Sequence, residues 1–213
     1  SFWIADGQKM SKSMGNFVDL ATIEGYFAKY GLDAWRWYMA TQGPLQASDA
    51  DFRAQHFHDV YTSELVNVVG NCPSRVTAMI GKYFEGRMPA DAQQGGEWPA
   101  RCAQAVADWT KAIDALDLVA AANAPMALLR DVDAFINRTE PFKVAKDPSR
   151  AGELASILAQ CAEAVRIAGV MLEPFLPEKT AQLRTALGQD AGAPLAKRAA
   201  WGGIAPGTPL AKC

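Results

Sequence analysis

Apolar residues recur every three or four positions through a long stretch of the chain, from Gln55 to Tyr83. The members of this series are Phe57, Val60, Tyr61, Leu65, Val68, Val69, Cys72, Val76, Met79, Ile80 and Tyr83. Such spacing places the side chains on one face of a helix, which must be covered by other helices. The series therefore predicts a long core helix in an all-helical assembly.

Further helical patterns follow this series. They cover Trp98–Leu116, Leu118–Phe135 with a possible kink at Pro125, Ser149–Met171 and 177–187. A Gly/Pro/Gln-rich loop at 85–97 separates the first two, and the Gly/Pro/Ala-rich tail at 188–213 reads as extended. No strand–helix–strand alternation is present. The stripes of Trp, Phe and Val on these helices read as core.

The N-terminal part is organised differently. Residues 2–6 read as a strand, and two short helices and an acidic linker follow. The first helix begins after Asp19 and ends at Gly31. The second covers Asp33–Met39 and is ended by Gly43-Pro44. The linker that follows contains Asp49 and Asp51. The expected fold is mainly α, a helical bundle preceded by a small strand/loop/helix segment. Its expected divisions are 1–52, 53–187 and a tail at 188–213 that packs back on the fold.

Composition narrows the classes of function. The 213 residues carry a net charge of −2 and are 50% hydrophobic, so a nucleic-acid contact would have to come from a local patch. Four cysteines without a Cys-x-x-Cys pair favour reduced thiols in a cytoplasmic protein over a zinc or disulfide framework. His56 and His58 could share a metal, but no third ligand is near, and a polar helix surface is favoured. No membrane-spanning stretch or signal peptide is visible.

The segment Gly7–Asn16 carries the clearest chemical signal. It places Lys9, Met10, Ser11, Lys12 and Ser13 between two glycines that tolerate positive φ. Lysines supply flexible positive charge and serines supply hydroxyl donors, which suits a polyphosphate that must be held and then released. An ordinary polar hairpin tip has the same composition.

The order Lys-Met-Ser-Lys-Ser followed by Gly-Asn resembles the signature loop of class I aminoacyl-tRNA synthetases. The resemblance implies that Lys9 and Lys12 hold the triphosphate of ATP, with Lys12 nearest the departing pyrophosphate, and that all five residues of the loop contact the phosphates. It also implies ATP with Mg²⁺ as the nucleotide, and no metal site within this chain.

Other segments resemble the methionyl-tRNA synthetase family along essentially the whole chain. They are Tyr30–Tyr38, Asp49–Phe52, Gly70-Asn71 with Ser74–Val76, Glu140–Lys146, and Trp201–Gly203 with Pro206-Gly207 and Pro209-Leu210. The last of these is similar to a C-terminal tail that folds back on the catalytic half in that family. The ensemble implies methionine as the amino acid, tRNA(Met) as the partner, and an anticodon-binding domain in the bundle.

In that family the equivalents of Asn71 and Arg75 hydrogen-bond the first anticodon base, and the equivalent of Phe142 stacks on it. Asn and Arg four residues apart share one helix face and can donate to a cytosine edge. Simpler roles are a helix cap for Asn71, a solvated charge for Arg75 and a core anchor for Phe142. Two departures from the family stand out. Phe142 replaces the more usual Trp, and Pro73 either kinks the long helix or starts a new one capped by Asn71.

We therefore expect the C-terminal portion of a methionine–tRNA ligase, an enzyme whose upstream part binds methionine. The chain opens at Ser1 within a strand pattern and has no His-Ile-Gly-His-type motif or nucleotide-binding sheet. The isolated chain is accordingly expected to be inactive. Alternatives are a cysteinyl, leucyl, isoleucyl or valyl enzyme, or a non-catalytic tRNA-binding module with a relic loop.

Overall fold

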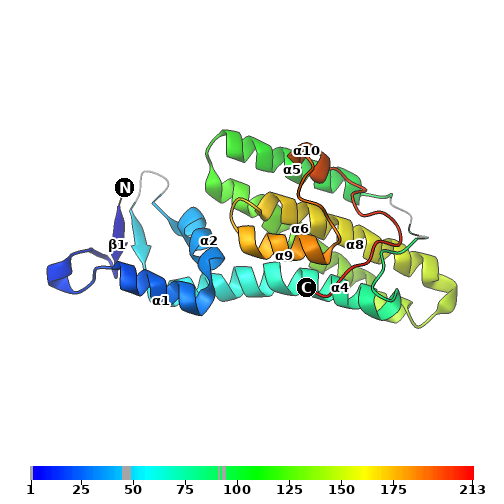
Figure 1. The fold of residues 1–213 in the computed structure, drawn as a ribbon, viewed down its shortest axis with the longest axis horizontal. Coiled ribbons are helices and arrows are strands. Elements are labelled where there is room, and N and C mark those ends of the chain that lie inside the picture. Colours follow the sequence, from blue (N-terminus) through cyan, green and yellow to red (C-terminus); the bar gives the residue numbers. More distant parts are fainter. Residues whose placement is uncertain (1, 45–48, 91, 93–94) are drawn as a thin grey trace.

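The computed structural model describes residues 2–44, 49–90, 92 and 95–213. A small cap, made of the described residues up to Phe52, stands at one end, and a helical bundle forms the rest (Figure 1). The expected mainly helical fold with a strand-containing N-terminal segment is confirmed. Residues 91, 93 and 94 of the predicted loop at 85–97 lie outside the described residues.

The elements follow one another along the chain as strands, α-helices, the short 3₁₀ turns η1 and η3, and the π-helix η2. They are β1 (Trp3–Ala5), β2 (Gln8–Lys9), η1 (Lys12–Met14), α1 (Leu20–Tyr30), α2 (Leu32–Gln42), β3 (Ala50–Phe52), α3 (Ala54–Val60), η2 (Tyr61–Gly70), α4 (Asn71–Tyr83), α5 (Trp98–Asp114), α6 (Leu118–Thr139), α7 (Pro141–Val144), η3 (Pro148–Arg150), α8 (Ala151–Leu172), α9 (Pro177–Ala186) and α10 (Leu195–Arg198). Each predicted helix is present, with ends within a few residues of the expected ones.

The cap is built on a three-stranded sheet in the order β2-β1-β3. Strand β1 pairs antiparallel with β2 and parallel with β3, where Ala5 lies opposite Phe52. Residues 45–48 of the predicted acidic linker lie outside the described residues. The prediction was wrong at Asp51, because Ala50–Phe52 forms β3, and Asp49 directly precedes this strand. Phe52 is 7% exposed, and burying this ring against the cap favours the strand.

Helices α1 and α2 lie between β2 and β3 in the sequence and connect these two strands of the sheet. The Asp19 side chain accepts a hydrogen bond from the N–H of Thr22, and Gly31 ends α1 with a φ of +84°, as expected. Aromatic rings then join the cap to the bundle. Tyr26 lies 4.7 Å from Phe57 of α3 between ring centroids, and Tyr38 lies 4.9 Å from the same ring.

The predicted long helix is continuous from α3 to α4, and it runs under both the cap and the bundle (Figure 1). Its middle part, η2, is a π-helix. Pro73 does not start a helix capped by Asn71, because Asn71 lies inside α4 and the residue at its N-cap is Gly70. Pro73 lies in the first turn of α4, and the side chain of Asn71 makes no capping hydrogen bond.

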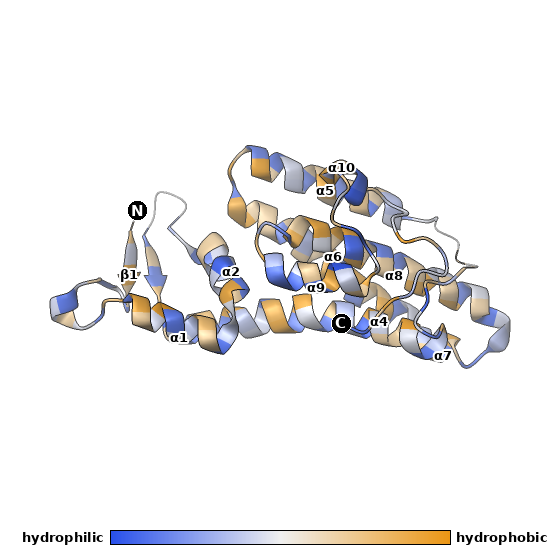
Figure 2. Cartoon of the chain, in the orientation of Figure 1, coloured by the Kyte–Doolittle hydropathy of each residue, from blue (hydrophilic) through white to orange (hydrophobic). Residues whose placement is uncertain are grey.

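Helix α8 is the centre of the bundle. It packs against α4, α5, α6, α7 and α9. Apolar residues occupy most of its length (Figure 2), and nearly all of them are buried. The segment Pro148–Leu172 is long and apolar enough to span a membrane by composition. However, 89% of its most apolar window is buried inside the bundle, as a core helix requires.

The tail returns across the bundle and packs against α8 through a buried ion pair. Glu163 and Arg166 are 0% and 4% exposed, and their side chains lie 2.8 Å apart. Glu163 accepts hydrogen bonds from the N–H groups of Gly202 and Ile204, and Arg166 donates to the carbonyl of Ala200. These backbone groups satisfy the two buried charges. The tail also contains the short helix α10, so it is not wholly extended.

Candidate ATP loop and anticodon site

The Lys/Ser segment begins as a hairpin. Asp6 and Gly7 both have positive φ, at 51° and 74°, and they join β1 to β2. Both positive φ values are typical of the tight turns that match the twist of paired strands. Lys9 therefore projects from the last residue of β2, and Lys12 begins η1 three residues later.

Asn16 closes the loop between these two lysines. Its Oδ1 accepts a hydrogen bond from the N–H of Ser11 at 2.8 Å, and its Nδ2 donates to the carbonyl of Lys9 at 3.1 Å. The Oγ atoms of Ser11 and Ser13 lie 2.8 Å apart. The sequence analysis placed Asn16 in the motif without giving it a role. Its side chain holds the two ends of the loop together.

Both lysines are exposed, and no ion pair engages either of them among the described residues. The Nζ of Lys12 lies 5.7 Å from the centroid of the Phe17 ring, a cation–π contact. Ser11 and Ser13 flank Lys12 with hydroxyl groups. The loop thus presents two ammonium groups and two hydroxyls, and no carboxylate of the described residues forms an ion pair with either lysine.

The hairpin is anchored to β3 by Asp51. Its Oδ1 accepts a hydrogen bond from the N–H of Gly7 at 3.1 Å, and its Oδ2 lies 2.6 Å from the guanidinium of Arg53. The Gly7 hydrogen bond, followed by Arg53, lowers the pKa of this carboxyl below its usual value of 3.8. Asp49 holds the other end of β1 by accepting from the N–H of Phe2.

The two histidines lie on α3 and bond to different neighbours. His56 contacts the side chain of Gln42, and His58 contacts the hydroxyl of Tyr30. Within the part of the chain that the structure describes, no group of three or more His, Cys, Asp or Glu side chains could hold a metal ion. The loop offers cations and hydroxyls rather than metal ligands, so we assign no metal-dependent step to it.

The second predicted site lies on α4. Asn71 and Arg75 are one helical turn apart, as their spacing predicts. Arg75 is not a free surface charge. Its guanidinium donates to Oδ1 of Asn137 on α6 at 2.9 Å and lies 3.5 Å from Asp133. Burial raises the pKa of Asp133, while Arg75 opposes that shift.

Asn71 and Phe142 are both exposed. Asn71 has no side-chain hydrogen bond to the described residues, so its amide is available to a ligand. Phe142 is 45% exposed on the short helix α7, while Pro141 and Val144 beside it are buried. An exposed ring on a buried turn does not fit the core-anchor interpretation.

Helix α7 follows α6 directly and lies at the same end of the molecule as the C-terminal half of α4 (Figure 2). The bond between Arg75 and Asn137 joins α4 to the last turns of α6, five residues before Phe142. No hydrogen bond or cation–π contact joins Phe142 to Asn71 or Arg75 among the described residues. The sequence analysis missed Asn137, because its partner is 62 positions away.

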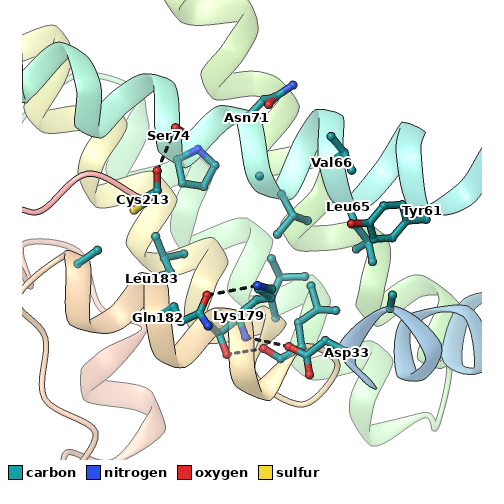
Figure 3. Close-up of a pocket in the computed structure, with 18 of the residues that line it drawn as sticks. Asp33, Tyr61, Leu65, Val66, Asn71, Ser74, Lys179, Gln182, Leu183 and Cys213 are labelled. Atoms are coloured by element: carbon teal, nitrogen blue, oxygen red, sulfur yellow. Dashed lines mark hydrogen bonds between the residues drawn. The ribbon is translucent and has the colours of Figure 1, made fainter. Parts of the chain in front are cut away.

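A cavity of about 590 Å³ lies between the cap, η2 and α9 (Figure 3). Apolar side chains of Leu65, Val66 and Leu183 form much of its wall. Asp33 of α2 is 4% exposed at its edge and accepts a hydrogen bond from the N–H of Lys179. This cavity is separate from the Lys/Ser loop.

Residues 1–77 match the family model described as tRNA synthetases class I (M). Methionine–tRNA ligase of Streptomyces coelicolor is 37% identical over 190 residues, which cover 86% of this chain and 35% of that protein. The enzyme of Listeria monocytogenes is 35% identical, covering 87% of this chain and 28% of its relative. The chain belongs to the methionyl-tRNA synthetase family. It spans about a third of the length of these curated relatives.

Solved structures of methionyl-tRNA synthetases share the fold. The Mycobacterium tuberculosis methionyl-tRNA synthetase in complex with methionyl-adenylate superposes with a TM-score of 0.84 at 22% identity, covering 98% of this chain and 41% of that one. A second structure of that enzyme bound by methionyl-adenylate gives 0.84 at 23% identity, covering 99% and 42%. At this identity the likeness concerns the fold alone.

Proposed function

We propose that this chain is the C-terminal portion of a methionine–tRNA ligase. In this role it contributes the loop that holds the ATP phosphates, and the bundle reads the tRNA(Met) anticodon. The observation that carries the first part is that neither Lys9 nor Lys12 forms an ion pair with a described residue, on a loop closed by Asn16. Two cations at the ends of a short, tied loop suit a triphosphate.

The chemistry of adenylate formation gives these cations their role. As the methionine carboxylate attacks the α-phosphorus of ATP, the bond to pyrophosphate breaks and negative charge grows on the leaving group. An ammonium group about 4 Å away contributes about 4 kcal/mol at an effective dielectric constant near 20. Because this charge is largest in the transition state, the contact of Lys12 raises the rate more than the affinity.

The backbone of the loop supports the same role. Gly7 and Gly15 both have positive φ, so each end of the loop turns where side chains are disfavoured. Lys9 is fixed by β2, whereas Lys12 lies beyond it in η1. Such a loop can bring Lys12 to the pyrophosphate late in the reaction and release it afterwards. Mg²⁺ would neutralise part of the phosphate charge as a complex with ATP.

The anticodon role rests on three side chains. Asn71 offers an unengaged amide, Arg75 is held in a fixed position by Asn137, and Phe142 exposes a ring face. Edge hydrogen bonds combined with stacking are how proteins read unstacked single-stranded bases. A guanidinium fixed in advance loses less conformational entropy when it binds a base.

Exposed apolar side chains on the cap support a parent protein with a further domain. Phe2, Met14 and Leu20 are 75%, 56% and 68% exposed, and Phe17 is 44% exposed. Large apolar side chains gathered at one end of a molecule mark a surface that another body covers. In this proposal the covering body binds methionine and adenine, and the protein works in the cytoplasm. The isolated 213 residues are then inactive.

The test uses the full-length parent. Lys12→Ala should slow adenylate formation by about 10²–10³-fold, as the loss of one transition-state donor does, and leave methionine affinity nearly unchanged. Lys29→Ala is the matched control, because this lysine lies in the same cap but over the Tyr30 ring. Equal rates for both variants in pre-steady-state kinetics would remove Lys12 from the mechanism.

The rival proposal, a tRNA-binding module with a relic loop, predicts no adenylation by the parent at all. Methionine-dependent ATP–pyrophosphate exchange by the parent would exclude it. The same exchange measured on these 213 residues should stay at background. Exchange above background would show that the chain holds its own methionine and adenine sites.

A further inference from the structure

The cavity between the cap and the bundle has no part in either proposed site. Its volume is about 590 Å³, within the range of about 300–1,000 Å³ that is typical of small-molecule sites. Asn71 borders it, but the Asn71 side chain projects from the helix on the side opposite Leu183 (Figure 3). The cavity can therefore hold a ligand without using the proposed anticodon side chains.

The walls of this cavity are held in place by hydrogen bonds. At the cap end, the carboxylate of Asp33 accepts from the N–H of Lys179 at 2.8 Å, and the guanidinium of Arg36 donates to the carbonyl of Pro174 at 2.7 Å. At the other end, two hydrogen bonds of Cys213 hold the tail to α4. A site whose walls are already fixed loses less conformational entropy when it binds a ligand.

The lining of the cavity is mainly aliphatic. One row of side chains comes from η2, and a second row runs from the end of α8 into α9 (Figure 3). The two rows consist of Leu65, Val66 and Val69, and of Leu172, Leu176 and Leu183. Val66 is 38% exposed although it is apolar. A trough between two rows of aliphatic side chains suits a flexible alkyl chain, which can adapt its shape to them.

Two polar side chains of α9 project into the same space. The Nζ of Lys179 donates to Oε1 of Gln182 at 3.4 Å, and the two groups lie side by side at the cavity (Figure 3). This bond leaves Nε2 of Gln182 as a second donor. An ammonium and an amide N–H₂ group next to each other can both donate to one carboxylate.

The charges of the lining also favour an anion. The charged side chains that line the cavity are Asp33, Lys179 and Lys212. Asp33 is 4% exposed and its Oδ1 is buried, so a ligand in the cavity does not reach this oxygen. Both lysines are exposed, and neither forms an ion pair with a described residue. The accessible charge is therefore positive, and it complements an acidic head group.

We propose that this cavity binds a medium-chain alkyl carboxylate. The chain lies between the aliphatic rows of η2 and α9, and the carboxylate accepts hydrogen bonds from Lys179 and Gln182. Each methylene group that leaves water makes binding about fourfold tighter. Because Ala34 of the cap also lines the cavity, the bound chain contacts the cap and the bundle at once.

Three ten-carbon probes that differ in their head groups test the preference for an anion. They are decanoate, 1-decanol and decyltrimethylammonium. Each is titrated into the methyl-labelled chain, and NMR spectra follow Leu65, Val66 and Leu183 at the cavity, with Val132 in the core of α6 as the unaffected reference. Decanoate should bind most tightly and the cation most weakly, and octanoate should bind about 10-fold more weakly than decanoate.

Two outcomes of this titration would overturn the proposal. If decyltrimethylammonium binds as tightly as decanoate, the cavity selects its ligand through Asp33 or not by charge. If the probes shift only Leu20, which is 68% exposed on the cap, they bind to the apolar cap surface and not in the cavity.

Lys179→Gln tests the head-group contact. It removes the charge and keeps the N–H that bonds to Asp33, so decanoate should bind about threefold to fivefold more weakly, and 1-decanol should be unaffected. Lys197→Gln is the matched control, because this exposed lysine of α10 lies outside the lining. Equal losses for decanoate and 1-decanol, or for the two lysine variants, would contradict the assignment of the carboxylate to Lys179.

A substitution that fills the cavity tests the position of the chain. Ala186→Phe places a ring in the lining at the end of α9, so decanoate should no longer shift the cavity methyl groups. Thr185→Phe adds the same ring at the neighbouring exposed position outside the lining, and it should leave decanoate binding unchanged. Unchanged affinity in a folded Ala186→Phe protein would overturn the proposal. Should this variant not fold, the Lys179→Gln comparison decides. None of these outcomes involves ATP or tRNA, so they are separate from the proposed function.

Discussion

The carboxylate of Asp33 accepts a hydrogen bond from the backbone N–H of Lys179 at 2.8 Å, across 146 positions of sequence. Lys179 is the third residue of α9, so Asp33 serves as a capping residue supplied by another helix. Leu176, which precedes α9, cannot cap it with its own side chain. The cap and the bundle are joined by this bond.

Asp33→Ala should therefore destabilise the protein by about 2 kcal/mol, the upper end for the loss of a helix cap. The free energy of unfolding in urea measures this loss. Asp33→Asn is the control, because its amide oxygen can still accept from Lys179. If Asp33→Asn and Asp33→Ala lower the free energy of unfolding equally, the hydrogen bond that caps α9 is not the source of the stability.

Arg36 lies on the same face of α2 and donates to the carbonyl of Pro174 at 2.7 Å. Arg36→Ala should lower the free energy of unfolding by about 1 kcal/mol through the loss of this bond, and leave adenylation by the parent unchanged. Arg130→Ala provides the comparison, since this exposed arginine has no partner among the described residues. A slower adenylation rate in Arg36→Ala at unchanged stability would contradict a structural role.

The anticodon proposal predicts a loss of base discrimination. Arg75→Ala and Phe142→Ala should each cost about 1–3 kcal/mol in kcat/KM for tRNA(Met). They should also narrow the gap between tRNAs with cytosine and with a substituted base at the first anticodon position. Adenylation without tRNA should be unaffected, and Phe142→Trp should be neutral or bind more tightly, because a larger ring stacks better.

Arg101→Ala is the matched control for Arg75, because Arg101 pairs with Glu97 and Asp131 on the bundle surface. It should leave both tRNAs unchanged. Equal weakening of the two tRNAs by Arg75→Ala, with a lower melting temperature, would assign Arg75 to the bond with Asn137 alone. The anticodon site would then lie elsewhere.

The hairpin anchor should depend on pH in a defined direction. The folded-state pKa of Asp51 is below 3.8, so its contribution to stability is present above that value and is lost as pH falls through the lower, folded pKa. The amide chemical shift of Gly7 should follow this titration in NMR spectra. In Asp51→Asn it should stay flat through the same range, and a midpoint above 3.8 in the native protein would contradict the assignment.

Gly203 should tolerate no side chain. A Cβ at this position would meet Cζ of Arg166 at 2.5 Å, against the buried ion pair with Glu163. Gly203→Ala should destabilise the protein by about 1–3 kcal/mol, as overpacking does. Gly25→Ala on the open face of α1 should instead stabilise by about 0.5–1 kcal/mol. Thermal unfolding of both variants measures these changes in stability. The prediction is refuted if both variants shift the melting temperature in the same direction.

Local sequence was enough for the helices and their ends. Asp19 and Gly31 bound α1 as predicted, because a side-chain cap and a positive φ depend on adjacent residues only. The pairing of β1 with β3 could not be predicted in this way. It joins Trp3 to Ala50 across two helices, and a parallel pair has no turn signal between its strands.

Some residues of the candidate site could likewise be predicted from local sequence, and others could not. The order of residues in the loop located Lys9 and Lys12, whereas the roles of Asn16 and Asn137 needed coordinates, since each depends on a partner that spacing does not reveal. Pro73 signalled an irregular helix, but a proline indicates only where an α-helix is disfavoured. Which geometry replaces it is decided by packing around η2.

The ion pair of Glu163 and Arg166 sets an order of events during synthesis on the ribosome. Chains fold from the N-terminal side as they emerge, yet these charges in the central helix find their backbone partners only in residues 198–204. Until that segment leaves the exit tunnel, the nascent bundle holds two charges without those bonds and stays loosely packed around α8. The bundle therefore becomes native only after residues 198–204 have been made.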